Sequence, residues 1–204
     1  RNQVAAGLNM GIAGIPWFTT DIGGFHGGNP DDPAFRELLI RWFEYGTFCP
    51  VMRLHGDREP HKPPMGSEGG AACVSGADNE VWSFGDEAYE ILCGYLVLRE
   101  KMKPYITELM KAAHEKGTPV MRPLFYDMPD DPKAWEVEDQ YMFGPDVLVA
   151  PILFEGARSR EVYLPAGTEW TNYWTGEKVA GGQTITADAP LAQIPLFTRN
   201  GREF

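Results

Sequence analysis

The segment Gly14-Ile-Pro-Trp-Phe-Thr-Thr-Asp-Ile-Gly-Gly-Phe25 runs a short β-prone stretch directly into one carboxylate, Asp21, and then into a pair of glycines. β-Branched and aromatic residues alternate over residues 15–20, which is typical of a short buried strand. Asp21 is then expected at the carboxyl end of this strand, and the glycines allow a positive φ or the close approach of another group to the backbone. In α/β barrels this end of a strand carries the catalytic residues.

A second strand end carries the next polar group. Residues 51–54, Val-Met-Arg-Leu, predict another short strand, and His55 and Gly56 follow it just as Asp21 and its glycines follow the first. Because the carboxyl ends of parallel strands lie on one edge of a sheet or barrel, we expect Asp21 and His55 to share that edge. A neutral imidazole can hydrogen-bond sugar hydroxyls. Arg53 lies on the same side of its strand as His55, and we expect it to form an ion pair in the wall of the barrel.

Each of these residues also has a plainer interpretation. An aspartate before two glycines often caps a turn through its own backbone, and a single histidine is more often structural than functional. The apolar surroundings of Asp21 favour a catalytic role, because Trp17, Phe18 and Phe25 would desolvate its carboxyl group and raise the pKa, as a general acid near neutral pH requires. Trp17 and Phe18 also offer apolar ring faces on which a sugar can pack.

Helices are expected on either side of the first strand. The spacing of apolar residues predicts a helix over residues 2–13. Asp31 or Asp32, followed by Pro33, predicts the start of a second helix that ends near Gly46.

The middle of the chain predicts a long loop, a long helix and a third strand. Residues 57–79 are rich in proline and glycine and lack hydrophobic periodicity, which is typical of a loop. A helical pattern extends over residues 86–116, with a kink expected at Pro104 and a stop at Gly117, and residues 120–125 predict a strand. This alternation indicates an α/β fold with a parallel sheet or barrel, but three units cannot close an eight-stranded barrel.

Short β-rich runs dominate the rest of the chain. A short helix is expected around residues 135–143, and after it five runs separated by turns predict an antiparallel β-sandwich: residues 147–153, 161–164, 169–174, 183–186 and 194–198. We therefore predict three parts: residues 1–126 with the alternating helices and strands of a parallel sheet or barrel, residues 127–144 as a connecting helix, and residues 145–204 as a C-terminal β domain.

Composition argues against several functions. The 204 residues carry a formal net charge of −11, whereas nucleic-acid binding needs clustered Lys and Arg, so we expect no nucleic-acid partner. No apolar run reaches about 18 residues, and we expect no membrane partner. Metal-ligand spacings and phosphate-binding glycine motifs are absent, so neither a metal nor a cofactor is expected. Cys49, Cys73 and Cys93 are predicted to be buried free thiols, which suits a cytoplasmic location.

Several motifs in order make the chain resemble glycoside hydrolase family 31, the α-glucosidase and α-xylosidase family. The resemblance covers essentially the whole chain, and its motifs lie at residues 14–25, 41–42, 52–56, 102–105, 117–123, 140–144, 149–151 and 162–165. It implies that Asp21 is the general acid/base, that His55 hydrogen-bonds the sugar in the −1 subsite, and that Phe18 forms an aromatic wall of that subsite. The nucleophilic aspartate and a sugar-binding arginine of the family have no counterpart in this chain.

The resemblance implies that residues 1–126 are the C-terminal part of a (β/α)8 TIM barrel and that residues 145–204 are the β domain that follows it. It also implies a retaining α-glycoside hydrolase that releases α-linked glucose or xylose from non-reducing ends. Retaining glycosidases need two carboxyl groups about 5–5.5 Å apart, so the chain by itself is expected to be inactive and to need the rest of a longer polypeptide that completes the barrel. An α-linked oligosaccharide is the expected substrate, and the oligomeric state stays open. Two alternatives also stay open: a carbohydrate-binding or interaction module without turnover, and an α-glucan lyase.

Overall fold

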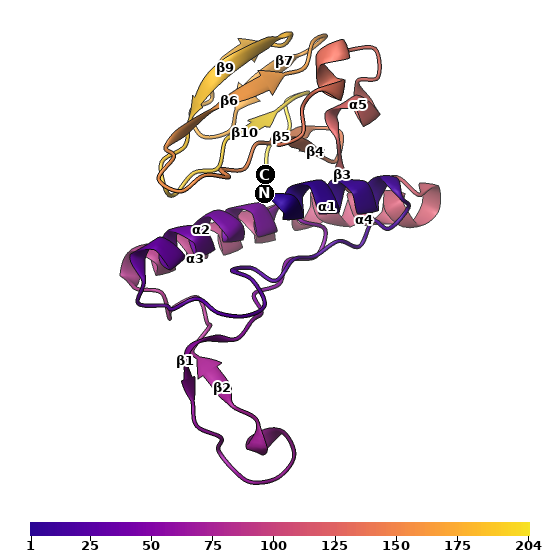
Figure 1. The fold of residues 1–204 in the computed structure, drawn as a ribbon. Coiled ribbons are helices and arrows are strands. Elements are labelled where there is room, and N and C mark those ends of the chain that lie inside the picture. Colours follow the sequence, from indigo (N-terminus) through magenta and orange to yellow (C-terminus); the bar gives the residue numbers. More distant parts are fainter.

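The computed structural model describes all 204 residues and has three tiers (Figure 1). A β-rich part lies above a layer of helices, and a two-stranded hairpin projects below. The α-helices are α1 (Asn2–Ile12), α2 (Pro33–Thr47), α3 (Asp86–Lys101), α4 (Lys103–Lys116) and α5 (Leu124–Asp127), with 3-10 turns at Gly69–Ala72 and Pro132–Trp135. None of these helices combines the length and the apolar character that a membrane crossing requires.

The first two helices form where the sequence predicts them. Helix α1 buries Val4 and Leu8. Helix α2 begins at Pro33, and the carboxylate of Asp32 accepts a hydrogen bond from the Ala34 N–H at 3.0 Å. Asp32 is therefore the N-cap, which decides between the two aspartates that the sequence left open.

The predicted long helix is two helices. Helix α3 ends at Lys101 and α4 starts at Lys103, so the break lies at Met102. Pro104 is in the first turn of α4, where a backbone N–H has no acceptor within the helix, so the missing N–H of proline costs no hydrogen bond. Gly117 ends α4 in the left-handed conformation with φ of 67°, as predicted.

The strands form three separate sheets. A six-stranded antiparallel sheet has the order β3-β4-β5-β10-β7-β8, β6 pairs with β9, and β1 pairs with β2. The strand bounds are β1 (Arg58–Lys62), β2 (Ser75–Ala77), β3 (Met121–Arg122), β4 (Tyr141–Phe143), β5 (Val147–Val149), β6 (Ser159–Leu164), β7 (Glu169–Asn172), β8 (Lys178–Ala180), β9 (Gln183–Asp188) and β10 (Leu196–Thr198). The five predicted runs each overlap one of these strands, whereas β1, β2, β4 and β8 were not predicted.

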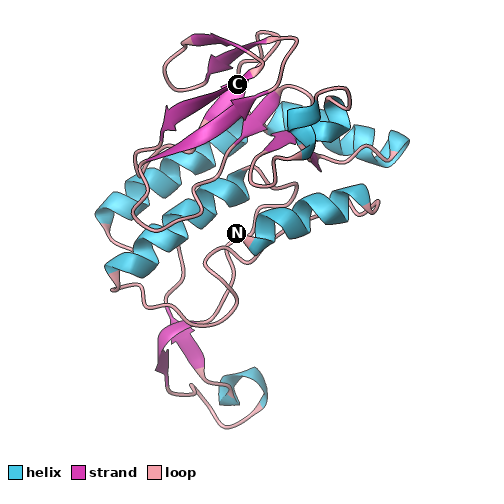
Figure 2. Ribbon diagram, turned by 45° about the horizontal axis from the view of Figure 1, so that its top comes forward, coloured by secondary structure: helices cyan, strands magenta, loops and turns pink.

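Both faces of the six-stranded sheet are covered at strands β4 and β5. On one face, Tyr141 and Phe143 belong to the core that the sheet shares with the helices, which lie along this side in Figure 2. On the other face, Met142 and Leu148 pack in a second core with residues of β6 and β9, including Val162. Because successive strand residues point to opposite faces, such strands are apolar at every position. The arrangement confirms the predicted antiparallel sandwich.

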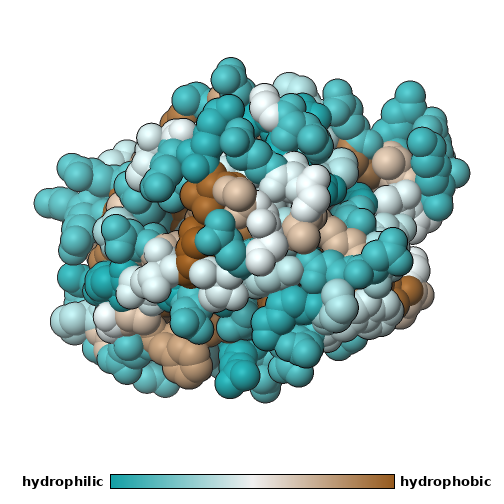
Figure 3. Space-filling model, turned by 90° about the horizontal axis from the view of Figure 1, so that it is seen from above, coloured by the Kyte–Doolittle hydropathy of each residue, from teal (hydrophilic) through white to brown (hydrophobic).

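The outer side of the β-rich part is mainly hydrophilic. Seen from above, polar side chains cover most of this face, and hydrophobic side chains gather near its middle (Figure 3). The apolar residues of the sheets are thus used mainly for the two cores.

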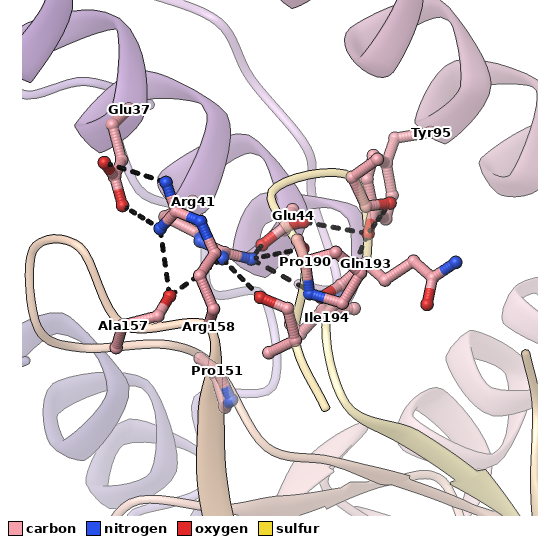
Figure 4. Close-up of polar contacts among 12 residues, drawn as sticks. Glu37, Arg41, Glu44, Tyr95, Pro151, Ala157, Arg158, Pro190, Gln193 and Ile194 are labelled. Atoms are coloured by element: carbon pink, nitrogen blue, oxygen red, sulfur yellow. Dashed lines mark hydrogen bonds and ion pairs between the residues drawn. The ribbon is translucent and has the colours of Figure 1, made fainter. Parts of the chain in front are cut away.

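A buried polar cluster joins the helices to the β-rich part (Figure 4). The Arg41 guanidinium, from α2, donates to the backbone carbonyls of Ala157, Ala189, Pro190 and Gln193 at 3.2, 2.7, 3.2 and 3.4 Å. It also pairs with the Glu44 carboxylate at 3.1 Å. The Tyr95 hydroxyl, from α3, donates to Glu44 at 3.0 Å and accepts from the Ile194 N–H at 2.9 Å. Burial raises the pKa of Glu44 to about 8, against the opposing effects of Arg41 and Tyr95.

Two elements differ from the prediction near the hairpin and the connection. Residues 57–79 contain strands β1 and β2 instead of an unstructured loop, because backbone pairing and not an apolar period holds them: only the first residue of β1 is buried. Residues 135–143 contain strand β4 instead of a helix. Its three residues are all buried, and a short apolar run has no period that separates strand from helix.

The third predicted strand is short and joins the β-rich part. Only Met121–Arg122 are extended, they pair antiparallel with β4, and α5 follows at once. The domain limits at residues 126 and 145 stay a prediction.

The cysteines differ in their surroundings. Cys49 is buried, Cys93 is half-buried and Cys73 is exposed, and all three are free thiols. The prediction of burial is therefore wrong for Cys73, which lies in the projecting hairpin instead of a core. The cytoplasmic location stays a prediction.

Candidate active site

The two segments that carry the candidate residues lie side by side and run in the same direction. Backbone hydrogen bonds join the Val51 N–H to the Phe18 carbonyl at 3.1 Å, the Ile22 N–H to Arg53 at 3.3 Å, and the Asp57 N–H to Phe25 at 2.8 Å. An isolated parallel bridge pairs His26 with Asp57. The predicted parallel alignment is present, but neither segment forms a regular strand, because these few bonds do not make a continuous ladder.

The first segment alternates between two sides. Trp17 is 60% exposed and the Asp21 side chain 20%, whereas Phe18 is 5% exposed and Ile22 fully buried. Residues two apart in an extended chain point the same way, so Trp17 and Asp21 share the open side. Phe18 points into the core, where its ring contacts the backbone of Gly7 in α1 so closely that no Cβ would fit there. The structure thus places Phe18 apart from the other three candidates.

Asp21 forms an ion pair across the two segments. Its carboxylate contacts the Arg53 guanidinium, whose side chain is half-exposed. The expected ion pair of Arg53 is present, and its partner is the carboxylate predicted to be catalytic. Ile22, in the core, and a turn bond from the Gly24 N–H to the Asp21 carbonyl at 2.8 Å hold the carboxylate in place.

His55 is exposed on the same edge, next to an aromatic ring. Its ring centroid lies 5.5 Å from that of Phe25, which is itself 52% exposed and stacks edge-on against His26 at 4.4 Å. The imidazole therefore has an apolar neighbour on one side and solvent on the other.

The edge carries groups that suit a neutral polyhydroxylated ligand. It offers a carboxylate and an imidazole that can hydrogen-bond hydroxyl groups, and the indole of Trp17 is free to pack against a sugar ring. Retaining glycosidases use two carboxyl groups, and this edge offers the one of Asp21.

Sequence reasoning missed the partner of Asp21. Arg53 was expected to pair within a barrel wall, and its position two residues before His55 was the signal that it shares the exposed side of the segment. Arg58, in the segment predicted as a loop, also contacts both turns of the edge and carried no recognisable motif.

Both parts of the chain match models of one protein family. The sequence matches the family 31 TIM-barrel domain of the glycosyl hydrolases over residues 1–109 and the family 31 C-terminal domain over residues 117–202. An alpha-xylosidase of Saccharolobus solfataricus is 40% identical over 201 residues, which are 98% of this chain and 25% of the relative. Alpha-glucosidase 2 of Bacillus thermoamyloliquefaciens is 36% identical, over 95% of this chain and 22% of its own length.

The fold is shared with solved structures of such enzymes. The structure of a GH31 alpha-xylosidase from a soil metagenome, complexed with xylose, superposes with a TM-score of 0.95 at 57% identity, over 98% of this chain and 30% of that one. The chain thus spans about a quarter of the length of the curated relatives that it matches. It comprises the C-terminal part of a TIM barrel and the β domain that follows it, and it belongs to glycoside hydrolase family 31.

Proposed function

We propose that this chain is one part of a retaining α-glycosidase that releases α-linked xylose or glucose from non-reducing ends. The observation that carries the proposal is the parallel alignment of the two segments, which brings Asp21, Arg53 and His55 to one exposed edge. The named relatives, an alpha-xylosidase and an alpha-glucosidase, support this class of sugar.

The rest of the enzyme would complete the barrel. An open cleft of about 450 Å3 lies between α1, α2 and residues 151–155, and its lining includes the apolar side chains of Val4, Phe35, Leu38 and Trp42. We propose that further barrel elements of the same polypeptide pack against such surfaces and supply the nucleophilic aspartate. The 204-residue chain alone would then lack turnover.

Hydrolysis with retention needs a proton donor and a nucleophile. In the sequence-based prediction, Asp21 protonates the leaving glycosidic oxygen, the nucleophile forms the glycosyl-enzyme, and Asp21 then removes a proton from water. The contact with Arg53 favours a second role. The guanidinium contacts Oδ1 of the carboxylate, so this oxygen already has a partner within the chain. In that second role Asp21 is an anionic partner that orients Arg53 and binds hydroxyl groups of the sugar, and the proton donor lies elsewhere.

Turnover of defined substrates tests the function. The complete enzyme should hydrolyse p-nitrophenyl α-xyloside or α-glucoside, and proton NMR should show the α-anomer as the first product. An anhydro-sugar product would instead identify a lyase. Binding of xylose or glucose in calorimetry, with no product from any α-linked substrate, would refute hydrolysis and leave a binding module.

A leaving-group series separates the two roles of Asp21. As the proton donor, Asp21→Ala should slow an α-linked disaccharide by about 10²–10⁴-fold but spare the corresponding α-glycosyl fluoride, which needs little protonation, and azide should give an α-glycosyl azide. As the partner of Arg53, Asp21→Ala should slow both substrates alike, azide should give no adduct, and Arg53→Met should reproduce the same pattern.

A further inference from the structure

Arg58 joins the two turns that carry the candidate residues. It is the first residue of β1 and is fully buried, although it lies at the base of an exposed hairpin. Its Nη2 donates to the carbonyls of Ile22 and His55 at 3.0 and 3.4 Å, its Nη1 to those of Gly24 and Gly27 at 2.9 Å each, and its Nε to the Asn79 side-chain oxygen at 3.0 Å. Three of the carbonyls follow Asp21 in the chain, and the fourth is that of His55 itself.

The guanidinium fills a space that two glycines leave open. Gly23 and Gly56 have φ of 85° and 146°, a backbone conformation that favours glycine. A Cβ at Gly23 would lie 2.9 Å from Arg58 Nη2, and a Cβ at Gly56 would lie 2.7 Å from the same atom. These glycines lie in the turns that follow Asp21 and His55. The short distances explain why glycine is needed there: the Arg58 guanidinium approaches the backbone too closely for a Cβ.

The chemistry of this position is specific to arginine. A guanidinium has five N–H donors in a planar fork, and the five hydrogen bonds of Arg58 use one donor each. A lysine ammonium has three donors and no plane, so it cannot reach acceptors on both turns in the same way. Burial lowers the pKa of the Arg58 guanidinium, and the carboxylates of Asp57 and Asp21 oppose this effect.

We propose that Arg58 is a positioning residue for the reaction: it holds the turns after Asp21 and at His55 in one fixed relation, so that both side chains face the same sugar. Arg58 touches no substrate in this role. Only the expected change in kcat rests on the proposed glycosidase function. The effect of Arg58 on the geometry of the two turns does not depend on turnover.

Kinetics of the complete enzyme test the proposal. Arg58→Lys keeps the charge but removes hydrogen bonds to at least one turn, and a displacement of about 1 Å at a catalytic group can cost on the order of 10²-fold in rate. We expect kcat to fall about 10²-fold with KM changed much less, and Arg58→Met to behave similarly. Asn79→Ala is a milder second variant that removes the acceptor of Nε and a bond from the Asn79 amide to the Gly56 carbonyl. It should lower kcat about 3- to 10-fold.

Arg160→Lys is the matched control. Arg160, in β6, donates to the carbonyls of Asp139 and Pro151 at 3.0 and 2.6 Å. Strand β6 lies at the opposite end of the molecule from β1 (Figure 1). The control loses comparable bonds, so it should lower thermal stability to a similar degree while kcat stays unchanged. A merely structural Arg58 would behave like Arg160, with an unchanged kcat for the folded enzyme, and that result would overturn the proposal.

A readout without activity separates this proposal from the glycosidase function. In proton NMR of the histidine rings, Arg58→Lys should move the Hε1 resonance of His55 and leave that of His114, which lies in α4, in place. If no α-glycoside is hydrolysed by the wild type but the His55 resonance moves, the function fails and the positioning role stands. An unmoved His55 resonance together with a wild-type kcat would refute the positioning role.

Discussion

Replacing Arg41 should release the loop that ties the β-rich part to the helices. Arg41 is buried and donates to four backbone carbonyls, three of which lie in residues 189–193. In Arg41→Met, an apolar side chain of similar length leaves these carbonyls without their donor. The three hydrogen bonds to residues 189–193, at about 1 kcal/mol net each, amount to a loss of about 3 kcal/mol for the local opening of the loop.

Amide hydrogen exchange measures this local opening directly. A loss of about 3 kcal/mol corresponds to exchange about 10²-fold faster, and we expect it for the Gln193 and Ile194 amides, which donate to Pro190 and to the Tyr95 hydroxyl. Exchange followed by mass spectrometry resolves a peptide that covers residues 189–195.

A neighbouring arginine provides the control. Arg158 forms an exposed ion pair with Glu37 beside the same loop (Figure 4), and surface ion pairs contribute little. Arg158→Met should therefore change the exchange of residues 189–195 by less than about threefold. An equally small change in Arg41→Met would refute the reasoning, because it would mean that the carbonyls gain as much from water as from the guanidinium.

Two further predictions concern pH and helix capping. Burial raises the pKa of Glu44 from 4.5 to about 8. Between these two pH values the folded state keeps the Glu44 proton, whereas the unfolded chain has lost it. The free energy of unfolding should therefore fall as pH rises through this range, by up to about 1.4 kcal/mol per pH unit. Urea denaturation of Glu44→Gln should show a shallower fall than the wild type over this range, and parallel curves would contradict the raised pKa. Asp32→Ala removes the N-cap of α2 and should lower the free energy of unfolding by about 1 kcal/mol in the same assay. Asp31→Ala removes only an exposed ion pair with Arg36 and should lower it by less than about 0.5 kcal/mol. Equal losses in the two variants would contradict the assignment of Asp32 as the cap.

Local signals in the sequence predicted several helix limits. Helix α1 follows apolar spacing, α2 follows the aspartate and proline at its start, and Gly117 ends α4. These features depend on residues within one or two turns of each other, so a single sequence contains the whole of the information. The antiparallel strands after residue 145, except β8, were likewise visible as short apolar runs between turns.

Strands whose pairing depends on distant residues were harder to predict. The sequence over residues 15–20 and 51–54 reads as strands, but each has too few backbone partners in this chain to form a ladder. Strand β1 shows the opposite error: its sequence lacks a hydrophobic period, yet pairing with β2 makes it a strand. In both cases the neighbouring segment decides, since strand formation depends on cross-strand pairing more than on intrinsic preference.

In the candidate site, too, the sequence determined some features and only the tertiary structure decided others. The sequence by itself determined that Asp21 and His55 follow equivalent segments and that glycines at both turns leave the backbone open to a close approach. Only the tertiary structure decided what each group contacts: Arg53 pairs with Asp21, Phe18 turns into the core, and the Arg58 guanidinium occupies the space between the turns. The physical reason is that turn geometry depends on the residues of the turn itself, whereas an ion pair or a buried guanidinium depends on acceptors that lie about 30 residues away in the chain and meet only after folding.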